Sequence, residues 1–69
     1  MKKEYVDYVA IIKNYRKKYG LSQHDLADLA CVDSSTIRAI EKYRANPRLD
    51  TFTSILDALN LTIEVVEVK

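Results

Sequence analysis

Three consecutive hydroxyl side chains, Ser34, Ser35 and Thr36, are followed by the cations Arg38, Lys42, Arg44 and Arg48. Ser34 and Ser35 follow Asp33, which places two nucleophiles beside an acid. Hydrolytic catalysis would also need a positioned base, and the single histidine, His24, lies on the preceding predicted helix. His24 also lacks a Cys or His partner at the spacing of metal ligands. We therefore expect no catalytic residue, metal or cofactor.

The basic residues are localised in one part of the chain. The 69 residues contain 11 Lys and Arg against 10 Asp and Glu, a net charge of +1. Counted by segment, residues 1–48 contain ten basic and six acidic residues (+4), whereas residues 49–69 contain one Lys and four acids (−3). A near-neutral total therefore does not exclude a polyanionic partner. Because so short a chain shelters no large catalytic cavity, we expect a single binding domain that depends on another chain.

The sequence predicts a cytoplasmic protein without a membrane partner. Cys31 is the only cysteine, and an unpaired thiol suits a reducing compartment. We interpret it as a structural thiol, with a redox sensor as the alternative. The apolar run from Tyr8 to Ile12 is far too short for an export signal or a membrane span.

Apolar residues recur at spacings of three and four along most of the chain, which is typical of helices. A tyrosine-rich stripe (Tyr5, Tyr8, Ile12, Tyr15 and Tyr19) predicts a first helix from about Glu4 to Tyr19, which Gly20 ends. A second helix is predicted to begin with a capping box of Ser22 and Asp25 and to end near residues 31–32. Asp33 is expected to cap a third helix over residues 34–43, and Asp50 a fourth that extends to Leu59. The expected buried residues of these three helices are Leu26, Ala27, Ala30, Ile37, Ile40, Phe52, Ile55, Leu56 and Leu59.

The last residues have the composition of a β-strand. Residues 61–68 are rich in β-branched side chains and lack helical spacing. A strand needs a partner for its backbone groups, and no second strand is predicted in this chain. We therefore expect two copies of the chain to form a symmetric dimer through an antiparallel ribbon. The predicted dimerisation residues are Thr62, Ile63, Val65, Val66 and Val68.

Two short predicted helices joined by a tight turn have the organisation of a helix-turn-helix. The polar side of the second one carries Ser34, Ser35, Arg38 and Lys42. A helix of this kind fits the major groove of DNA, where short hydroxyl side chains permit close approach. Arg38 has the geometry for a bidentate contact to guanine. The arrangement therefore indicates a DNA-binding module.

Three segments together resemble the XRE, or phage-repressor-like, helix-turn-helix family: Leu21–Ala27, Val32–Glu41 and Asn46–Phe52. The resemblance covers roughly residues 12–61 and is much more specific than one short motif. It implies a mainly α, lambda-repressor-like bundle of four to five short helices, with residues 1–69 as a single domain and residues 61–68 as a strand that pairs across a dimer. The implied function is that of a non-enzymatic, homodimeric transcriptional repressor that binds an inverted-repeat operator.

The resemblance also implies a role for individual residues. Gln23, Ser34, Ser35 and Arg38 correspond to positions that contact bases. Thr36, Lys42, Arg44, Asn46 and Arg48 correspond to positions that contact backbone phosphates. Arg16 and Glu41 correspond to a partly buried ion pair that ties the first helix to the end of the third.

One residue departs from the family pattern, and one segment narrows the resemblance. Cys31 stands where the family commonly has glycine in a turn with positive φ, a conformation that costs a non-glycine residue about 1–2 kcal/mol. The segment Leu49–Thr62, which runs directly into the predicted strand, resembles HipB-type antitoxins. That subgroup implies repression of the protein's own operon and binding to a HipA-type kinase toxin. The alternatives are an antitoxin whose main role is to neutralise the toxin and a dimerisation module that binds no DNA.

Overall fold

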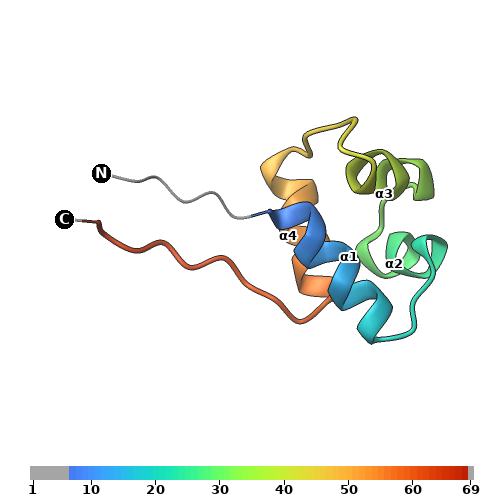
Figure 1. Ribbon diagram of the computed structural model, residues 1–69, viewed down its shortest axis with the longest axis horizontal. Helices are drawn as coiled ribbons and strands as arrows, with labels where there is room; N and C mark the ends of the chain where they lie inside the picture. Colours follow the sequence, from blue (N-terminus) through green and yellow to red (C-terminus); the bar gives the residue numbers. More distant parts are fainter. Residues whose placement is uncertain (1–6, 69) are drawn as a thin grey trace.

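Four α-helices form the bundle in residues 7–68, the part of the chain that the computed structural model describes (Figure 1). They are α1 (Tyr8–Lys18), α2 (Gln23–Ala30), α3 (Ser34–Glu41) and α4 (Leu49–Ala58). The mainly α fold expected from the apolar spacing is confirmed. The predicted start of the first helix near Glu4, and with it Tyr5, lies outside the described residues.

The first two helices begin at side-chain caps. One carboxylate oxygen of Asp7 accepts a hydrogen bond from the backbone N–H of Ala10 at 3.1 Å. Ser22 Oγ accepts from the backbone N–H of Asp25 at 2.9 Å, and the Asp25 carboxylate accepts from the backbone N–H of Ser22 at 2.9 Å. These bonds satisfy amides that have no partner within the helix. The predicted capping box at α2 is therefore confirmed.

The last two helices begin without a side-chain cap. Asp33 is the N-cap residue of α3, as predicted, but its side chain makes no capping hydrogen bond. The prediction that Asp50 caps α4 is wrong, because the extended Arg48 is the N-cap and its carbonyl accepts from the backbone N–H of Phe52 at 2.8 Å. Asp50 lies in the first turn instead, where its negative charge interacts favourably with the helix dipole.

All four helices end in the same motif. The backbone turns left-handed just beyond each helix, at Gly20 (φ 69°), Cys31 (φ 58°), Tyr43 (φ 59°) and Asn60 (φ 59°). The next residue then donates its N–H to a carbonyl in the last helical turn, from Leu21 to Arg16, Val32 to Ala27, Arg44 to Ala39 and Leu61 to Leu56. This is the Schellman motif. In three of the four motifs the residue that follows is a half-buried apolar side chain against the core, whereas at the end of α3 it is the exposed Arg44.

The core is built from apolar residues of all four helices. α2 contacts both α3 and α4, and α1 packs against α3. The buried residues are Val9, Ile12, Leu26, Ala27, Ala30, Ile37, Ile40, Ile55, Leu56 and Leu59. Full burial of an Ile or Leu side chain contributes about 1.5–3 kcal/mol. Apart from Phe52, which is half-buried, the residues expected inside the last three helices are in this core.

The stripe predicted for the first helix differs in part from the observed one. Ile12 is buried and Tyr8 and Tyr15 are half-buried, but Tyr19 is exposed. Val9, which the tyrosine spacing left out, is buried in the core. The reason is that Tyr19 lies beyond the last helical residue, where the chain has already begun to turn.

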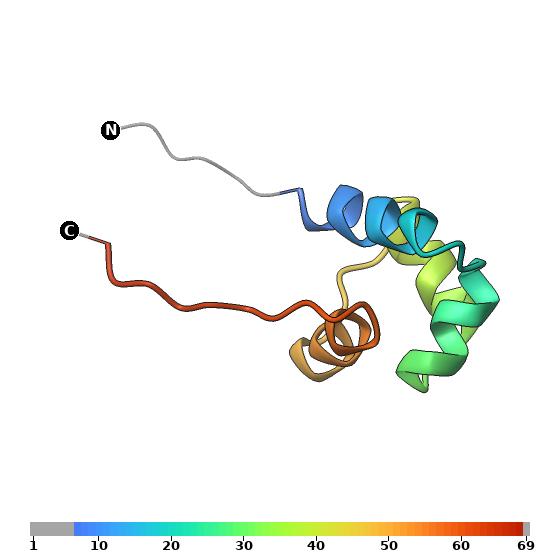
Figure 2. The ribbon, with the colours of Figure 1, turned by 90° about the horizontal axis from the view of Figure 1, so that it is seen from below.

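The predicted strand at residues 61–68 is not formed in the described part of this single chain. After Leu61 the chain extends away from the bundle (Figure 2). Val65 and Val68 are 94% and 85% exposed, and no residue of the segment forms a strand or bridge pairing. A strand requires a ladder of hydrogen bonds to a neighbour, and residues 7–68 provide no second strand.

Replacing Cys31 with glycine should stabilise the fold. Cys31→Gly removes the Cβ that opposes the left-handed backbone, so the free energy of unfolding should rise by about 1 kcal/mol. In a domain of this size that corresponds to a rise in Tm of roughly 4–8 °C, measured by thermal denaturation followed by circular dichroism. Cys31→Ser is the matched control, because it removes the thiol but keeps the strain. A glycine variant less stable than the serine variant would contradict this account of the turn.

Candidate nucleic-acid interface

α2, the short turn at residues 31–33 and α3 form a helix-turn-helix. The left-handed Cys31 reverses the chain after α2, so that α3 packs directly against it. Figures 1 and 2 both place these two helices at the end of the molecule opposite the tail of residues 62–68. The predicted DNA-binding unit and the predicted dimerisation segment are therefore spatially separate.

The two faces of α3 differ sharply in character. Ile37 and Ile40 are fully buried in the core. Ser35, Arg38 and Lys42 are all exposed, and their spacing of three and four residues puts them on one ridge along the helix. Of the predicted base-contacting residues on α3, Ser35 and Arg38 are thus fully available, and Ser34 is half-buried at the first helical position.

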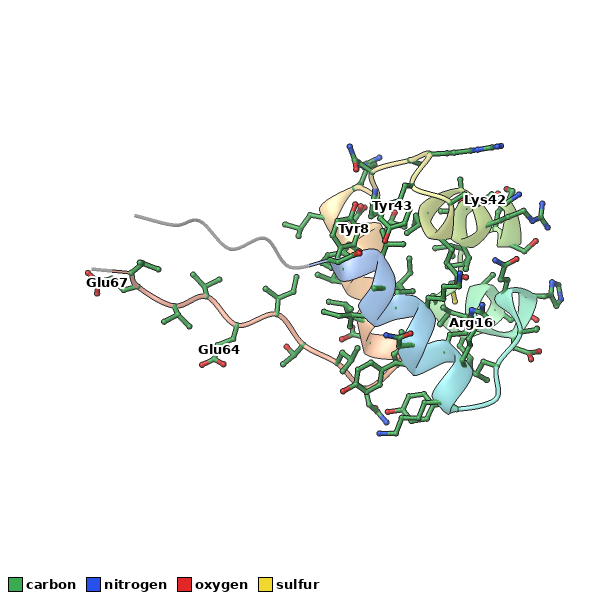
Figure 3. All side chains as sticks on the ribbon, in the orientation of Figure 1. Tyr8, Arg16, Lys42, Tyr43, Glu64 and Glu67 are labelled. Atoms are coloured by element: carbon green, nitrogen blue, oxygen red, sulfur yellow. The ribbon has the colours of Figure 1, made fainter. Side chains whose placement is uncertain are left out.

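The predicted phosphate-contacting residues lie at the end of α3 and in the loop that follows. Lys42, Arg44, Asn46 and Arg48 are exposed, and Figure 3 shows Lys42 where α3 ends. The Arg48 Nε lies 3.6 Å from a carboxylate oxygen of Asp50, a solvent-exposed ion pair of the weakest kind. Thr36 differs from the others, because it is half-buried in the first turn of α3.

Two hydrogen bonds tie this loop to the start of α1. The Tyr43 hydroxyl donates to Asp7 Oδ2 at 2.7 Å, and the Tyr8 hydroxyl donates to Asn46 Oδ1 at 3.2 Å. Figure 3 labels both tyrosines, Tyr8 at the start of α1 and Tyr43 after the end of α3. The bond from Tyr43 lowers the pKa of the Asp7 carboxyl, and the same bond raises the pKa of Tyr43. The Asn46 side chain is thereby held by its carbonyl oxygen, which leaves its two N–H donors for another acceptor.

A bidentate ion pair lies beneath α3. Arg16 Nε donates to Glu41 Oε2 at 2.7 Å, and Arg16 Nη2 donates to Glu41 Oε1 at 2.9 Å. The Arg16 and Glu41 side chains are 11% and 3% exposed. Arg16 Nη1 also donates to the Leu21 carbonyl at 2.8 Å, which fixes the segment just before α2. The ion pair implied by the family resemblance is present.

The electrostatics of this pair favour its charged form. Burial by itself would raise the pKa of Glu41, but hydrogen bonds from Arg16 and Gln23 offset this effect and leave the pKa below its usual value of 4.5. The hydrogen bond to Glu41 raises the pKa of Arg16. Glu41 is therefore a structural carboxylate.

Gln23 stands apart from the other predicted base-contacting residues. It is the first residue of α2, half-buried, and its Nε2 donates to Glu41 Oε1 at 3.2 Å. Sequence reasoning identified Gln23 and Glu41 separately and missed their contact. It also missed the part played by Asp7 and Tyr43, although an aspartate directly before an apolar helical stripe is a recognisable cap signal.

An apolar groove lies on a different side of the bundle. It has a volume of about 560 Å³ and lies between α1, α4 and the start of the tail. Its lining residues are Tyr8, Ile11, Tyr15, Phe52, Leu56, Leu61, Thr62, Ile63 and Glu64. The described residues contain no group of three or more potential metal ligands. Within residues 7–68, no helix is long and apolar enough to cross a membrane.

Comparisons with known proteins agree with this geometry. A family model described as helix-turn-helix matches residues 12–66. An uncharacterized HTH-type transcriptional regulator of Haemophilus influenzae is 36% identical over 64 residues, which cover 88% of this chain. The match spans 65% of that relative's length.

Two solved structures contain chains of similar fold. One is described as a HipA-HipB-O2-O3 complex, and its matching chain is 28% identical with a TM-score of 0.80 over 100% of both chains. The other is a complex of a HipB variant with an O2 20mer, again 28% identical with a TM-score of 0.80, covering 100% of this chain and 99% of that one.

The chain therefore belongs to the helix-turn-helix family, in the XRE group that its three sequence segments predicted. This is a family of transcriptional regulators and not of enzymes. Its fold is similar to that of HipB.

Removing the charge of Glu41 should both destabilise the fold and change its acid sensitivity. Glu41→Gln should lower the free energy of unfolding at pH 7 by about 3 kcal/mol, because Arg16 loses its buried counter-charge. The folded-state pKa of Glu41 is depressed, so its stabilisation is complete above about pH 4.5 and is lost as the pH falls through the lower folded value. Urea denaturation between pH 2 and 7 should therefore show a shallower acid limb in the variant.

The variant should keep part of the acid limb, because the pKa values of Asp7 and Asp25 are also lowered by hydrogen bonds. Asp57→Asn, at an exposed position, is the control and should reproduce the parent curve. An acid limb of equal steepness in Glu41→Gln and the parent would show that the ion pair does not cause the loss of stability at low pH.

Proposed function

We propose that this chain is a homodimeric, sequence-specific DNA-binding repressor that places α3 in the major groove. The observation that carries the proposal is the exposed ridge of Ser35, Arg38 and Lys42 on α3 of a helix-turn-helix. A helix fits the major groove, where each base pair presents a distinct set of donors, acceptors and methyl groups. The core side of α3 anchors the helix, so the ridge is left to contact DNA.

The charge around α3 supports the same proposal. The cations of residues 34–48 are Arg38, Lys42, Arg44 and Arg48, and all four are exposed. Glu41 is the one acid in that segment, and Arg16 neutralises it. The surface therefore presents only positive charge from α3 and the following loop, which suits phosphate contacts on both sides of a groove.

The proposed contacts follow from chemical type and position. Arg38 can donate two parallel hydrogen bonds to guanine, and the hydroxyls of Ser34 and Ser35 can donate or accept near the start of α3. Gln23 contributes an amide from the start of α2. Lys42, Arg44, Asn46 and Arg48 contact backbone phosphates, and Thr36 does so with its hydroxyl.

The tail and the apolar groove support a dimer. Thr62, Val65, Val66 and Val68 are exposed in the single chain, as is Ile63 at 44%. Pairing of two tails as an antiparallel ribbon would satisfy their backbone groups, and the partner would cover the groove between α1 and α4. Two copies of α3 would then contact half-sites about one helical turn, or roughly 34 Å, apart.

We also infer the organisation and setting of the protein from this function. Residues 1–69 act as one DNA-binding domain with residues 61–68 as its dimerising segment. A repressor acts where the DNA is, which agrees with the cytoplasmic location that the unpaired Cys31 predicts.

A second candidate function is that of an antitoxin that binds a HipA-type kinase toxin and represses its own operon. The observation that favours it is the similarity, over the whole chain, to a HipB chain in a structure that also contains HipA. Co-expression with a HipA-type kinase should give a complex that co-purifies and relieves kinase toxicity. If no complex co-purifies and the toxicity is not relieved, the antitoxin function is excluded and the repressor function is unaffected.

Two arginine variants test the division between base and phosphate contacts. A duplex library of random sequence should first yield a salt-sensitive, sequence-selective site; its absence would favour the dimerisation module that binds no DNA. Arg38→Ala should then cost about 1–3 kcal/mol on the selected site and relax specificity at one base pair. Arg44→Ala should weaken binding to selected and random duplexes alike. Equal losses on both duplexes for Arg38→Ala would remove Arg38 from the base-contacting set.

Two neighbouring prolines test the ribbon. In an antiparallel pair, successive residues alternate between hydrogen-bonded and non-hydrogen-bonded positions. One of Val65→Pro and Val66→Pro should therefore remove ladder hydrogen bonds and shift the protein toward monomer in sedimentation velocity, while the other is tolerated better. In a single chain both substitutions fall in an unpaired segment and should leave the helical circular dichroism unchanged. Two variants that remain as dimeric as the parent would contradict strand pairing.

A further inference from the structure

One oxygen of Glu41 is shared between two side chains. Oε1 accepts from Arg16 Nη2 at 2.9 Å and from Gln23 Nε2 at 3.2 Å, while Oε2 accepts from Arg16 Nε at 2.7 Å. The carboxylate is nearly inaccessible to solvent, with a side chain 3% exposed. The two bonds from Arg16 therefore fix its plane, and Gln23 meets an acceptor whose place is set by the fold.

This contact determines which end of the Gln23 amide faces outward. An ionised carboxylate can only accept hydrogen bonds, so the end of the amide that faces Glu41 must be the NH₂ group. An amide is otherwise free to turn over and exchange its oxygen and nitrogen. With one N–H committed to Glu41, the groups left for another partner are the carbonyl oxygen and the second N–H.

We propose that Glu41, held by Arg16, is a positioning residue that fixes the Gln23 amide in one orientation and thereby makes Gln23 favour adenine over guanine. The inference rests on the proposed DNA-binding function. Adenine presents an N6 donor and an N7 acceptor in the major groove, which match an outward carbonyl oxygen and N–H. Guanine presents two acceptors, N7 and O6, and would oppose the outward carbonyl oxygen.

The fixed orientation gives discrimination that a free glutamine lacks. A glutamine whose amide can turn over could direct its NH₂ group toward a guanine acceptor, with little loss of affinity. Gln23 can do so only by breaking its bond to the buried Glu41 carboxylate, which would then face the carbonyl oxygen. Specificity for one base thus depends on a residue that lies on α3 beneath the DNA-contacting surface and does not contact DNA.

The test begins with the site selected from random duplexes. Gln23→Ala identifies the base pair at which Gln23 acts, as the position where the variant loses its base preference. Affinities of the parent for duplexes carrying adenine and guanine at that position should differ by about tenfold or more.

The decisive variant removes both charges together. Arg16→Met with Glu41→Leu replaces the ion pair by apolar side chains, a change that buried pairs often tolerate without loss of stability. The double variant should bind the guanine duplex within about threefold of the adenine duplex. Arg48→Met is the matched control, and it should weaken binding to both duplexes equally. A folded double variant with the parent's adenine preference would overturn the proposal.

If the double variant does not fold, a measurement on the unmodified protein tests the contact between Gln23 and Glu41. In ¹H–¹⁵N spectra one side-chain amide proton of Gln23 should lie downfield of its position in an exposed glutamine and be protected from exchange, because it is hydrogen-bonded to Glu41. Two protons that both resemble those of an exposed glutamine would overturn the proposal.

Two outcomes separate this proposal from the function on which it rests. A Gln23→Ala variant that binds selectively and changes no base preference overturns the role of Glu41 and leaves the repressor intact. Failure to select any duplex removes the DNA-binding function, and this proposal with it.

Discussion

The ion pair between Arg16 and Glu41 fixes how the helices of this small protein are arranged. Arg16 lies in the last turn of α1 and Glu41 is the last residue of α3, so the pair joins the ends of two helices distant in sequence. The same guanidinium holds the Leu21 carbonyl, and the same carboxylate holds Gln23. One charged pair therefore sets the position of α3 and of the first residue of α2. The candidate interface, which α2, α3 and the loop after α3 present, depends on this ion pair.

Backbone motifs at the helix ends also fix the arrangement of the helices. Each helix ends with a left-handed residue, and three of the four chain reversals place an apolar side chain against the core. The exception follows α3, where Arg44 is exposed and the chain is held instead by hydrogen bonds from Tyr43 to Asp7 and from Tyr8 to Asn46. The end of α3 is thus secured by polar contacts at the surface. Arg44 is thereby left exposed to a polyanionic partner.

Much of this could be predicted from the sequence because the relevant signals are local. The capping box of Ser22 and Asp25 and the apolar faces of the last three helices depend on residues a turn apart, and the structure has them as expected. The ion pair came from family resemblance, since no local pattern joins residues 16 and 41. The bond between Gln23 and Glu41 was missed for the same reason.

Two predictions that differ from the structure, the Asp50 cap and the terminal strand, failed for physical reasons. Asp50 was expected to cap α4, but the extended N-cap residue is Arg48, two residues earlier, and the helix begins at Leu49. The strand expected over residues 61–68 has the right composition, but strand structure requires a partner that residues 7–68 of one chain do not contain. Composition can thus indicate that a segment is suited to a β-strand, but the strand forms only when a neighbouring strand is present.

The most direct test of the central claim is to map the backbone amides of ¹⁵N-labelled protein as a selected duplex is added. We predict that the largest shift changes fall on α3, on the loop at residues 42–48 and on Gln23, and that added salt reverses them. Changes confined to the tail at residues 61–68 or to the groove between α1 and α4 would contradict the assignment of α3 as the DNA-contacting helix.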